Sequence, residues 1–264
     1  MKKVKLFVCT HKNYFMPKDK LYVPLLVGAD LNKCDGEYLK DNTGDNISNK
    51  NPYFCELTGI YWIWKNITDL DYVGIVHYRR YFSLYKGKMK TEEEKFKHIL
   101  SSKEAQDLLK DTDIILPKKR RYYIENLYNH YAHTMYIEPL DEVGKIIKEN
   151  HKEYYQEFEK LHKRRSAHMF NMFIMDKKDF DNYCEFLFST LFELEKKIDV
   201  TKYDKFHARF FGRVSELLLD VYINTNQIKY KEVNVIDMQK INWWKKGISF
   251  LNAKFFGKKY DSSF

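Results

Sequence analysis

Short apolar runs alternate with longer mixed stretches along the chain, and the two kinds of stretch have different periodicities. Runs with the length of a buried strand occur at 4–9, 72–76, 113–116 and 169–175. Apolar residues at helical spacing occur at 51–66, 90–111, 140–163, 179–197 and 213–223. This alternation predicts an α/β fold with a mainly parallel central sheet and helices on both of its faces.

Polar residues stand directly after the first two predicted strands. Thr10 and His11 follow the first strand, and the run His77-Tyr78-Arg79-Arg80 follows the second. The carboxyl ends of parallel strands are where α/β proteins place ligands, and a guanidinium binds phosphate oxygens through its planar fork. The pattern predicts a phosphate site. The alternative is a surface pair of arginines bound to the acidic residues at 69–71 or 92–94.

The stretch 28–52 lacks periodicity and is rich in Gly, Asp and Asn, which predicts a long loop. Asp45 and Asn46 lie within it and offer hydrogen-bond acceptors for a ribose or a base. The helix that follows presents free N–H groups at its N-terminus. The alternative is a turn in which the Asp and Asn side chains satisfy their own backbone and Asn51 caps the helix.

Composition excludes several classes of protein. The chain of 264 residues is 44% hydrophobic and 17% aromatic, which is too apolar for a disordered protein. Its four cysteines stand far apart without C-x-x-C spacing, so neither a zinc module nor a disulfide framework is indicated, and the reducing cytosol fits best. No apolar run reaches the about 18–20 residues of a spanning helix, and the N-terminus lacks a signal sequence.

The positive charge is concentrated at one end of the chain. The formal net charge is +9, and residues 240–264 hold six Lys against one Asp, so this segment carries +5. Trp244, Ile248, Leu251 and Phe255 fall on one helical stripe, which predicts a domain at 1–239 followed by a basic aromatic tail that lies on an anionic membrane surface. The alternative is a last helix docked on the body. Because most aromatics fall in apolar, core-type segments, nucleic acid is not expected as a partner.

His168 and Glu216 are the candidates for proton transfer. A carboxylate beside a sugar hydroxyl is the usual general base of inverting glycosyl transfer, whereas a glutamate near a helix start often only complements the helix dipole. The chain contains no G-x-S-x-G, H-E-x-x-H, Walker or G-x-G-x-x-G pattern, which argues against those hydrolases, P-loop enzymes and classical dehydrogenases.

Several ordered motifs between about residues 4 and 225 resemble those of one family. They are Asp45-Asn46-Ile47-Ser48, Cys55-Glu56-Leu57-Thr58-Gly59, Tyr61-Trp62, Trp64-Lys65-Asn66, His77-Tyr78-Arg79-Arg80-Tyr81, Ile115-Leu116-Pro117, His168 to Met175 and Gly212 to Leu218. The chain is similar to the bacterial glycosyltransferases, long classed as a domain of unknown function, that are encoded in capsular and exopolysaccharide loci.

This resemblance implies a GT-A type, Rossmann-like fold and a UDP-sugar donor, with galactofuranose as a candidate sugar. Carried over by position, it places the donor against Thr10, His11, Asp45, Asn46 and the run from His77 to Arg80. It places Asn171 and Arg213 on the acceptor side and makes Glu216 the base.

The resemblance also raises the question of a metal ion. Most GT-A enzymes hold Mn²⁺ or Mg²⁺ at an Asp-x-Asp motif after a strand, but the corresponding stretch here reads His77-Tyr78-Arg79. Two arginines would neutralise the leaving diphosphate in place of the metal, or His77 would be a single ligand of an altered site. Asp69 and Asp71 form an Asp-x-Asp pattern, but they precede the strand.

The expected function is transfer of a sugar to a lipid-linked oligosaccharide acceptor in capsule or exopolysaccharide synthesis. The protein would be cytoplasmic and peripheral on the inner face of the cell membrane. Two alternatives remain open: a phosphoglycosyl or sugar-phosphate transferase, which would release UMP rather than UDP, and a non-catalytic module that binds sugar nucleotides.

Overall fold

A computed structural model describes residues 2–239, 253–254 and 259, so the predicted tail helix lies almost wholly outside the described residues. The strands are β1 (Val4–Thr10), β2 (Tyr22–Leu26), β3 (Leu39–Lys40), β4 (Tyr72–His77), β5 (Arg80–Ser83), β6 (Ile114–Pro117), β7 (Arg120–Arg121), β8 (Ser166–Ala167), β9 (Phe173–Asp176) and β10 (Tyr230–Asp237). The helices are α1 (Asn51–Phe54), α2 (Leu57–Asn66), α3 (Glu92–Lys97), α4 (Ser102–Leu108), α5 (Leu127–Thr134), α6 (Glu138–Asn150), α7 (Lys152–Glu159), α8 (Lys177–Lys197) and α9 (Phe210–Thr225), with a 3-10 turn η4 (His207–Arg209) before α9.

The central sheet has eight strands in the order β3-β2-β1-β4-β5-β10-β6-β9, and β9 also pairs with β4. It is mixed, so the expectation of a mainly parallel sheet was wrong. Strand β1 pairs in parallel with β2 on one side and with β4 on the other, and β2 pairs in parallel with β3. Strand β6 pairs in parallel with β10. Strand β9 runs antiparallel to both β4 and β6, and β5 runs antiparallel to β4 and β10. A short apolar run reveals burial on both faces but not the direction of the strand.

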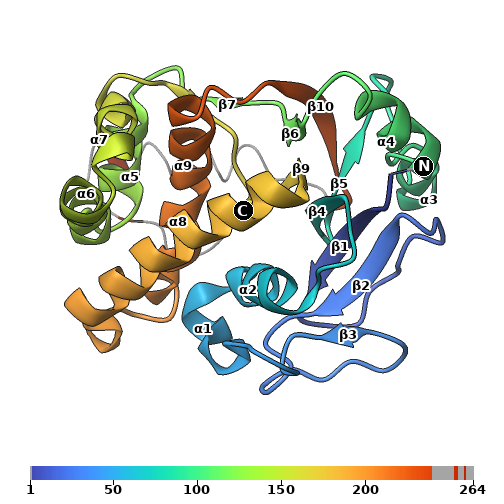
Figure 1. The fold of residues 1–264 in the computed structure, drawn as a ribbon, viewed down its shortest axis with the longest axis horizontal. Helices are drawn as coiled ribbons and strands as arrows, with labels where there is room; N and C mark the ends of the chain where they lie inside the picture. The colour runs from blue at the N-terminus through green and yellow to red at the C-terminus, as the bar shows by residue number, and fades with distance from the viewer. Residues whose placement is uncertain (1, 240–252, 255–258, 260–264) are drawn as a thin grey trace.

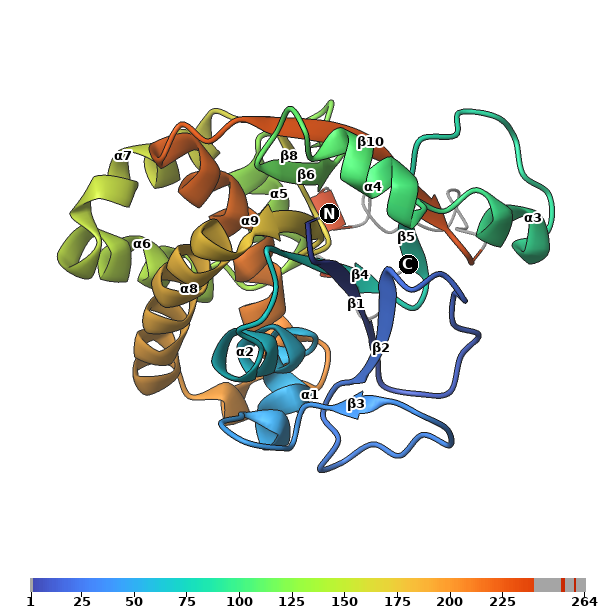
Figure 2. The same ribbon diagram turned by 45° about the vertical axis from the view of Figure 1, so that its right-hand side comes forward.

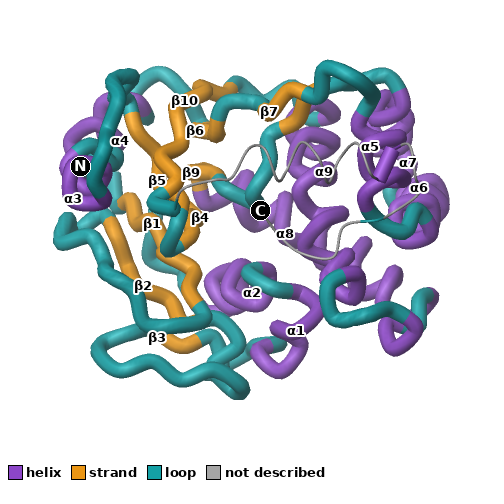
Figure 3. Tube along the Cα trace, turned by 180° about the vertical axis from the view of Figure 1, so that it is seen from behind, coloured by secondary structure: helices purple, strands orange, loops and turns teal. Residues whose placement is uncertain are grey.

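Helices cover both faces of the sheet, as the alternating pattern predicts, but unequally (Figures 1 and 2). On one face, alternate strand residues such as Phe7 and Ile75 join a large apolar cluster with α2, α6, α8 and α9. On the other face, Leu6 and Val76 join a smaller cluster that includes residues of α4. Figure 3 shows the result as a strand-rich half beside a helical half.

Several long helices expected from the pattern are broken in the structure. The stretch 51–66 divides into α1 and α2 because Cys55 takes a left-handed conformation, with φ of 54°. The stretch 90–111 divides into α3 and α4, each started by its own capping box, Thr91 with Glu94 and Ser101 with Glu104. The stretch 140–163 divides into α6 and α7. Apolar spacing persists across such breaks, so it does not locate them.

Helix α2 packs closely on the sheet because it contains Gly59. A Cβ at this position would lie 2.7 Å from a methyl group of Val27, just after β2, and 3.4 Å from the sulfur of Cys9. The missing side chain therefore lets the N-terminal end of α2 approach the carboxyl ends of β1 and β2. This approach brings the turn between α1 and α2 beside the ends of the parallel strands.

The apolar run 169–175 forms a strand only from Phe173 onward. Phe170 and Asn171 both have positive φ values, 81° and 49°, and they turn the chain before β9 begins. Strands β2 and β10 were not predicted, because Pro24 interrupts the first and exposed polar residues occupy much of the second. Among the described residues no helix has both the length and the apolar character required to cross a membrane.

Candidate functional site

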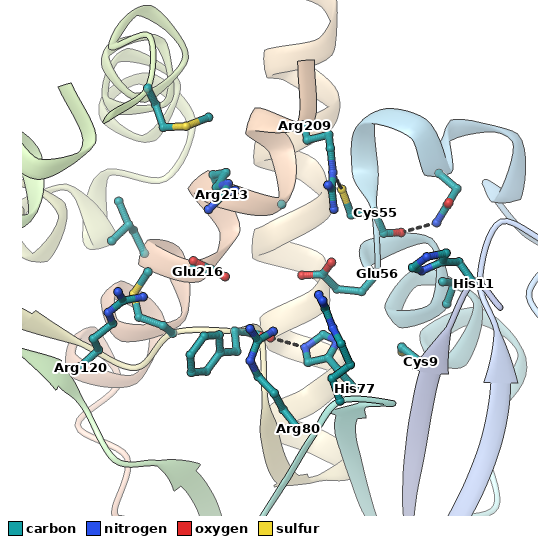
Figure 4. A pocket seen from close by; sticks show the side chains of 18 of the residues that line it. Cys9, His11, Cys55, Glu56, His77, Arg80, Arg120, Arg209, Arg213 and Glu216 are labelled. Atoms are coloured by element: carbon teal, nitrogen blue, oxygen red, sulfur yellow. Dashed lines mark hydrogen bonds between the residues drawn. The ribbon is translucent and has the colours of Figure 1, made fainter. Parts of the chain in front are cut away.

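A cavity of about 670 Å³ opens at the carboxyl ends of β1 and β4. The chain runs outward from β1 to β2 and β3 and then returns to β4 on the other side of β1, so these two strand ends flank a topological switch point. The other walls come from the α1–α2 turn, η4 with the first half of α9, β7 and α5. Figure 4 shows the side chains that converge there.

The residues predicted at the two strand ends all line this cavity: Thr10, His11, His77, Tyr78, Arg79 and Arg80. Cys9 pairs with His77 in the parallel ladder, so the two ends meet directly. The Thr10 hydroxyl donates to the carbonyl of Lys12 at 2.6 Å. Tyr78 is buried, and the edge of its ring packs against His11. This group forms one wall, which we call the strand-end wall.

Side chains at the end of β10 and just beyond it hold the two arginines. Arg80 donates from Nε to Asp237 at 3.1 Å and lies 4.4 Å from the ring centre of Phe170. Arg79 donates to the side chain of Gln239 at 3.0 Å. Their guanidiniums are therefore oriented by the protein before any ligand binds, which lowers the entropy cost of binding an anion.

His77 makes a short hydrogen bond to the carbonyl of Phe170, with 2.5 Å between Nε2 and the oxygen. A carbonyl only accepts, so Nε2 carries the proton and Nδ1 is the remaining acceptor of the neutral ring. Burial lowers the pKa of His77, opposed by Glu56 and by the Phe170 carbonyl. The lowered pKa favours the neutral ring, in which Nδ1 is the nitrogen open to a metal.

Two carboxylates, Glu56 and Glu216, project into the middle of the cavity from opposite walls (Figure 4). Glu216 lies within α9 rather than at its start, which corrects the prediction, because that helix already begins at Phe210. Burial raises the pKa of Glu216, Arg213 opposes that shift, and Glu56 adds to it. A raised carboxylate pKa is suited to accepting a proton near neutral pH.

Asn171 does not line the cavity but lies buried behind Glu56. Its amide donates to Oε1 of Glu56 at 2.7 Å and to the carbonyl of Gly212 at 3.1 Å. Its oxygen accepts from the hydroxyl of Ser215 at 3.0 Å. Asn171 therefore fixes the orientation of Glu56 against the first half of α9. Arg213, the other predicted acceptor-side residue, does line the cavity.

His168 is fully buried outside the cavity lining. Its Nδ1 pairs with Asp220 at 2.7 Å and its Nε2 with Glu232 at 3.0 Å, while its backbone N–H also donates to Asp220. Both ring nitrogens are occupied by protein carboxylates. The structure thus places His168 where it joins β8, α9 and β10, away from the carboxylates that face the cavity.

Asp45 and Asn46 also lie outside the cavity lining. Asp45 accepts from the hydroxyl of Tyr61 at 3.1 Å, and Asn46 donates to the carbonyl of Gly44 at 3.0 Å. The Asn66 side chain bridges the backbone of Asp45 from both sides. These are the local turn contacts of the alternative interpretation, and the structure does not bring either residue together with the strand-end wall.

Sequence reasoning missed most of the opposite wall, which we call the helical wall. It comprises Arg120, Tyr122, His130, Tyr131, Lys205, Arg209, Arg213 and Glu216. The basic run at 118–121 was visible in the sequence, but nothing in its spacing showed which of its residues faces a ligand. Glu56 was visible only inside a family motif.

One residue of the helical wall contacts the α1–α2 turn. The Arg209 side chain donates from Nε to the sulfur of Cys55 at 3.0 Å, and burial raises the pKa of that thiol to about 11.

Within the described residues the cavity is strongly cationic: five arginines and Lys205 line it against two glutamates. No group of three or more His, Cys, Asp or Glu side chains in that part of the chain is arranged to hold a metal ion. Asp69 pairs with Lys3 at 2.6 Å, and Asp71 accepts from the Lys3 backbone, so this Asp-x-Asp lies at the start of β4 and outside the cavity lining.

The fold and the site thus define an α/β protein with a cationic cavity at a topological switch point and two carboxylates inside it. Residues 5–227 match the family described as "Domain of unknown function (DUF4422)", and the chain belongs to this family, which confirms the resemblance. No curated protein matches the chain.

A solved structure extends the comparison. The chain is similar to the apo structure of the WbbM bifunctional glycosyltransferase, with 31% sequence identity and a TM-score of 0.82. The match covers 90% of this chain and 46% of that one, so the chain spans about half the length of the protein it matches. The shared fold is consistent with a GT-A-like architecture whose sheet is mixed.

Proposed function

We propose that this protein is a glycosyltransferase that moves a sugar from a nucleotide-diphosphate donor to a glycan acceptor. The observation that carries the proposal is the cavity itself, in which two carboxylates face each other between arginines from two walls (Figure 4). Likeness to a bifunctional glycosyltransferase supports the same reaction class.

The donor diphosphate binds the strand-end wall. Arg79 and Arg80 project from the switch point where β1 and β4 end, and both are pre-oriented by contacts with Gln239 and Asp237. Planar guanidiniums neutralise a leaving diphosphate through fixed hydrogen bonds, as a divalent cation does in enzymes with Asp-x-Asp. We therefore infer metal-independent transfer from a UDP-sugar. If a metal does take part, His77 would offer it Nδ1 alone.

Glu216 acts as the general base. The acceptor hydroxyl transfers its proton to Glu216 while its oxygen bonds to the anomeric carbon, and the bond from that carbon to the diphosphate breaks, releasing the nucleotide diphosphate. The raised pKa of Glu216 brings its basicity closer to what this proton transfer requires. Glu56, fixed by Asn171, orients sugar hydroxyls from the opposite side.

The family resemblance extends the proposal to its finer terms. The sugar is galactofuranose, the acceptor is a lipid-linked oligosaccharide of a capsule or exopolysaccharide, and the enzyme works at the inner face of the cell membrane. The predicted basic tail at 240–264 would contribute to that location.

The test is a screen of nucleotide diphosphates and their sugars by calorimetry and product analysis, with Mn²⁺ or with EDTA. We expect UDP to bind equally well in both conditions and a UDP-sugar to release UDP when acceptor is present. Release of UMP would instead identify a phosphoglycosyl transferase. Donor binding without turnover on any glycan acceptor would identify a binding module, and binding that requires Mn²⁺ would overturn the metal-independent site.

A further inference from the structure

The loop between β7 and α5 presents a basic and apolar surface beside the helical wall. Tyr123 is 81% exposed, the highest value among the large hydrophobic residues of the described chain, and Ile124 is 56% exposed. Exposed Arg121, Lys163 and Arg165 accompany them. We call these five residues the β7 patch. Figure 3 shows β7 where the strand-rich and helical halves meet.

Backbone pairing holds the five residues of the β7 patch together although they come from two segments. Arg121 of β7 pairs with Ser166 of β8. The Tyr122 N–H donates to the carbonyl of Arg165 at 2.7 Å, and the Arg165 guanidinium donates to the carbonyl of Tyr123 at 3.3 Å. Further along, the Leu127 N–H donates to the carbonyl of Arg164, next to Lys163. The cations therefore flank the two apolar side chains.

A buried carboxylate fixes the loop from inside. Glu125 is 6% exposed, and its two oxygens pair with Nδ1 of His130 at 2.9 Å and Nδ1 of His133 at 2.7 Å, both on α5. Its negative charge thus points inward and away from the patch. With Glu125 anchored, Tyr123 and Ile124 project outward without folding back onto the protein, so the exposed apolar surface is maintained by the fold.

Charge in the β7 patch is of one sign. Among the described residues no carboxylate lies within ion-pair distance of Arg121, Lys163 or Arg165, whereas neighbouring Arg164 pairs with Glu157. We propose that the β7 patch docks the protein on an anionic lipid bilayer. Tyr123 inserts at headgroup level with Ile124 below it, and the three cations contact lipid phosphates.

The chemistry favours a bilayer over a glycan chain or an acidic protein. An aromatic ring alone would suit stacking on a sugar, but an exposed isoleucine gains its free energy by leaving water for an apolar phase. A ring at the interface, an aliphatic tip and flanking cations are the three features of interfacial segments. Each basic residue near an anionic membrane raises binding about fivefold, so three give on the order of 100-fold.

The location relative to the cavity gives the patch a role. Arg120 and Tyr122 line the helical wall, while Arg121 and Tyr123, which alternate with them, are exposed. Docking through the β7 patch would therefore set the outer side of the helical wall on the membrane, with the cavity on the other side of β7. Vesicle binding does not depend on the proposed transferase activity, and either proposal can fail without the other.

The test is co-sedimentation of the full chain with vesicles of phosphatidylcholine alone or mixed with phosphatidylglycerol. We expect at least tenfold tighter binding to the anionic vesicles. Most of that gain should be lost in 0.5 M salt, because the Debye length falls from about 10 Å at 0.1 M toward about 3 Å at 1 M and screens the lipid charge. The triple variant Arg121→Glu, Lys163→Glu and Arg165→Glu should lose at least tenfold, and so should Tyr123→Ser with Ile124→Ser.

Matched controls change the same number of exposed residues elsewhere: Phe15→Ser with Leu31→Ser for the apolar change, and Lys86→Glu with Lys88→Glu and Lys90→Glu for the charge change. The controls should bind vesicles as the unchanged protein does, and every variant should keep its UDP affinity and circular dichroism. Vesicle binding unaltered in both patch variants would overturn the proposal and assign any membrane affinity to another segment. A patch variant that instead changes the oligomeric state in sedimentation velocity would identify a protein interface and also overturn it.

Discussion

The two walls of the cavity are built in different ways. The strand-end wall comes from residues that directly follow β1 and β4, where the pairing of Cys9 with His77 fixes their spacing. The helical wall combines β7 and the neighbouring α5 with η4 and α9, which come much later in the chain. Four of its residues, His130, Tyr131, Arg213 and Glu216, lie on the faces of helices rather than at strand ends. We expect the strand-end wall to serve the donor and the helical wall to serve the acceptor and the base.

This difference shows which residues of the cavity can change without disturbing the sheet. Residues at strand ends are positioned by the hydrogen-bond ladder of the sheet, which tolerates little change. Residues on helix faces are positioned by packing, so their side chains can be exchanged without disturbing the sheet. We therefore expect the donor-binding wall to change little and the acceptor-binding wall to change more among proteins with such a cavity.

The largest effect should come from Glu216→Gln. Loss of the proposed base should lower kcat about 10²- to 10⁴-fold, because general base catalysis contributes a factor of that size. UDP affinity measured by calorimetry should stay unchanged, since the residue belongs to the helical wall. Near-normal turnover would remove Glu216 from the mechanism, and Glu56→Gln, which leaves the opposite carboxylate in place, is the matched comparison.

The next effect concerns the stability of the helical wall. His168→Ala should lower the free energy of unfolding by about 3 kcal/mol, because the buried Asp220 carboxylate loses its imidazole partner and keeps only the backbone N–H of residue 168. Glu232→Gln removes the half-exposed partner on the other ring nitrogen and should cost much less. Denaturant titration measures both. If His168→Ala instead leaves stability unchanged and abolishes turnover, the sequence-based role in proton transfer is correct.

A smaller effect should separate the two walls directly. Arg79→Ala and Arg80→Ala should each weaken UDP binding about 10- to 100-fold, as expected for loss of a hydrogen bond between charged groups, and leave the acceptor KM nearly constant. Arg120→Ala should do the reverse. Calorimetry and initial rates report the two quantities. An equal loss of donor affinity in all three variants would show that the cavity has no such division.

The smallest effect is a shift in pH dependence. Since burial raises the pKa of Glu216, the base becomes protonated, and activity is lost, at a higher pH than for an ordinary carboxylate. Arg213 opposes the shift, so Arg213→Ala should move the acid limb of the kcat profile further toward neutral pH. A limb that moves to lower pH, or does not move, would contradict the assignment of that limb to Glu216.

Some of this architecture could be predicted from the sequence. Strand ends are marked by an abrupt change from apolar to polar residues, so Thr10, His11 and the run from His77 to Arg80 were correctly grouped in space. The direction of β9 could not be predicted, because a strand buried on both faces is apolar whichever way it runs. The break at Cys55 was hidden for a similar reason, since the apolar spacing continues across it.

Most of the helical wall was beyond prediction for a physical reason. Arg120 and Arg209 are polar residues in polar stretches, and only tertiary packing turns them toward the cavity. Glu216 was a candidate from its expected place near a helix start, and the family resemblance then made it the leading base. His168 and Asn171 show the opposite case, in which residues predicted to belong to the site do not line the cavity. His168 pairs with Asp220, and Asn171, within the left-handed turn, lies behind Glu56.

That left-handed turn has a consequence for how freely the protein can be redesigned. Phe170 holds a conformation that costs an ordinary residue roughly 1–2 kcal/mol, whereas the conformation of Asn171 is one that asparagine, like glycine, adopts more readily. The same turn aims one carbonyl at His77 and one amide at Glu56, joining the two walls. Glycine at position 170 would relieve strain but leave the backbone freer, and glycine at position 171 would remove the amide that holds Glu56. Directed evolution toward thermostability should therefore favour glycine at position 170. Selection that depends on a firmly held His77 and Glu56 should instead keep the residues now present at both positions.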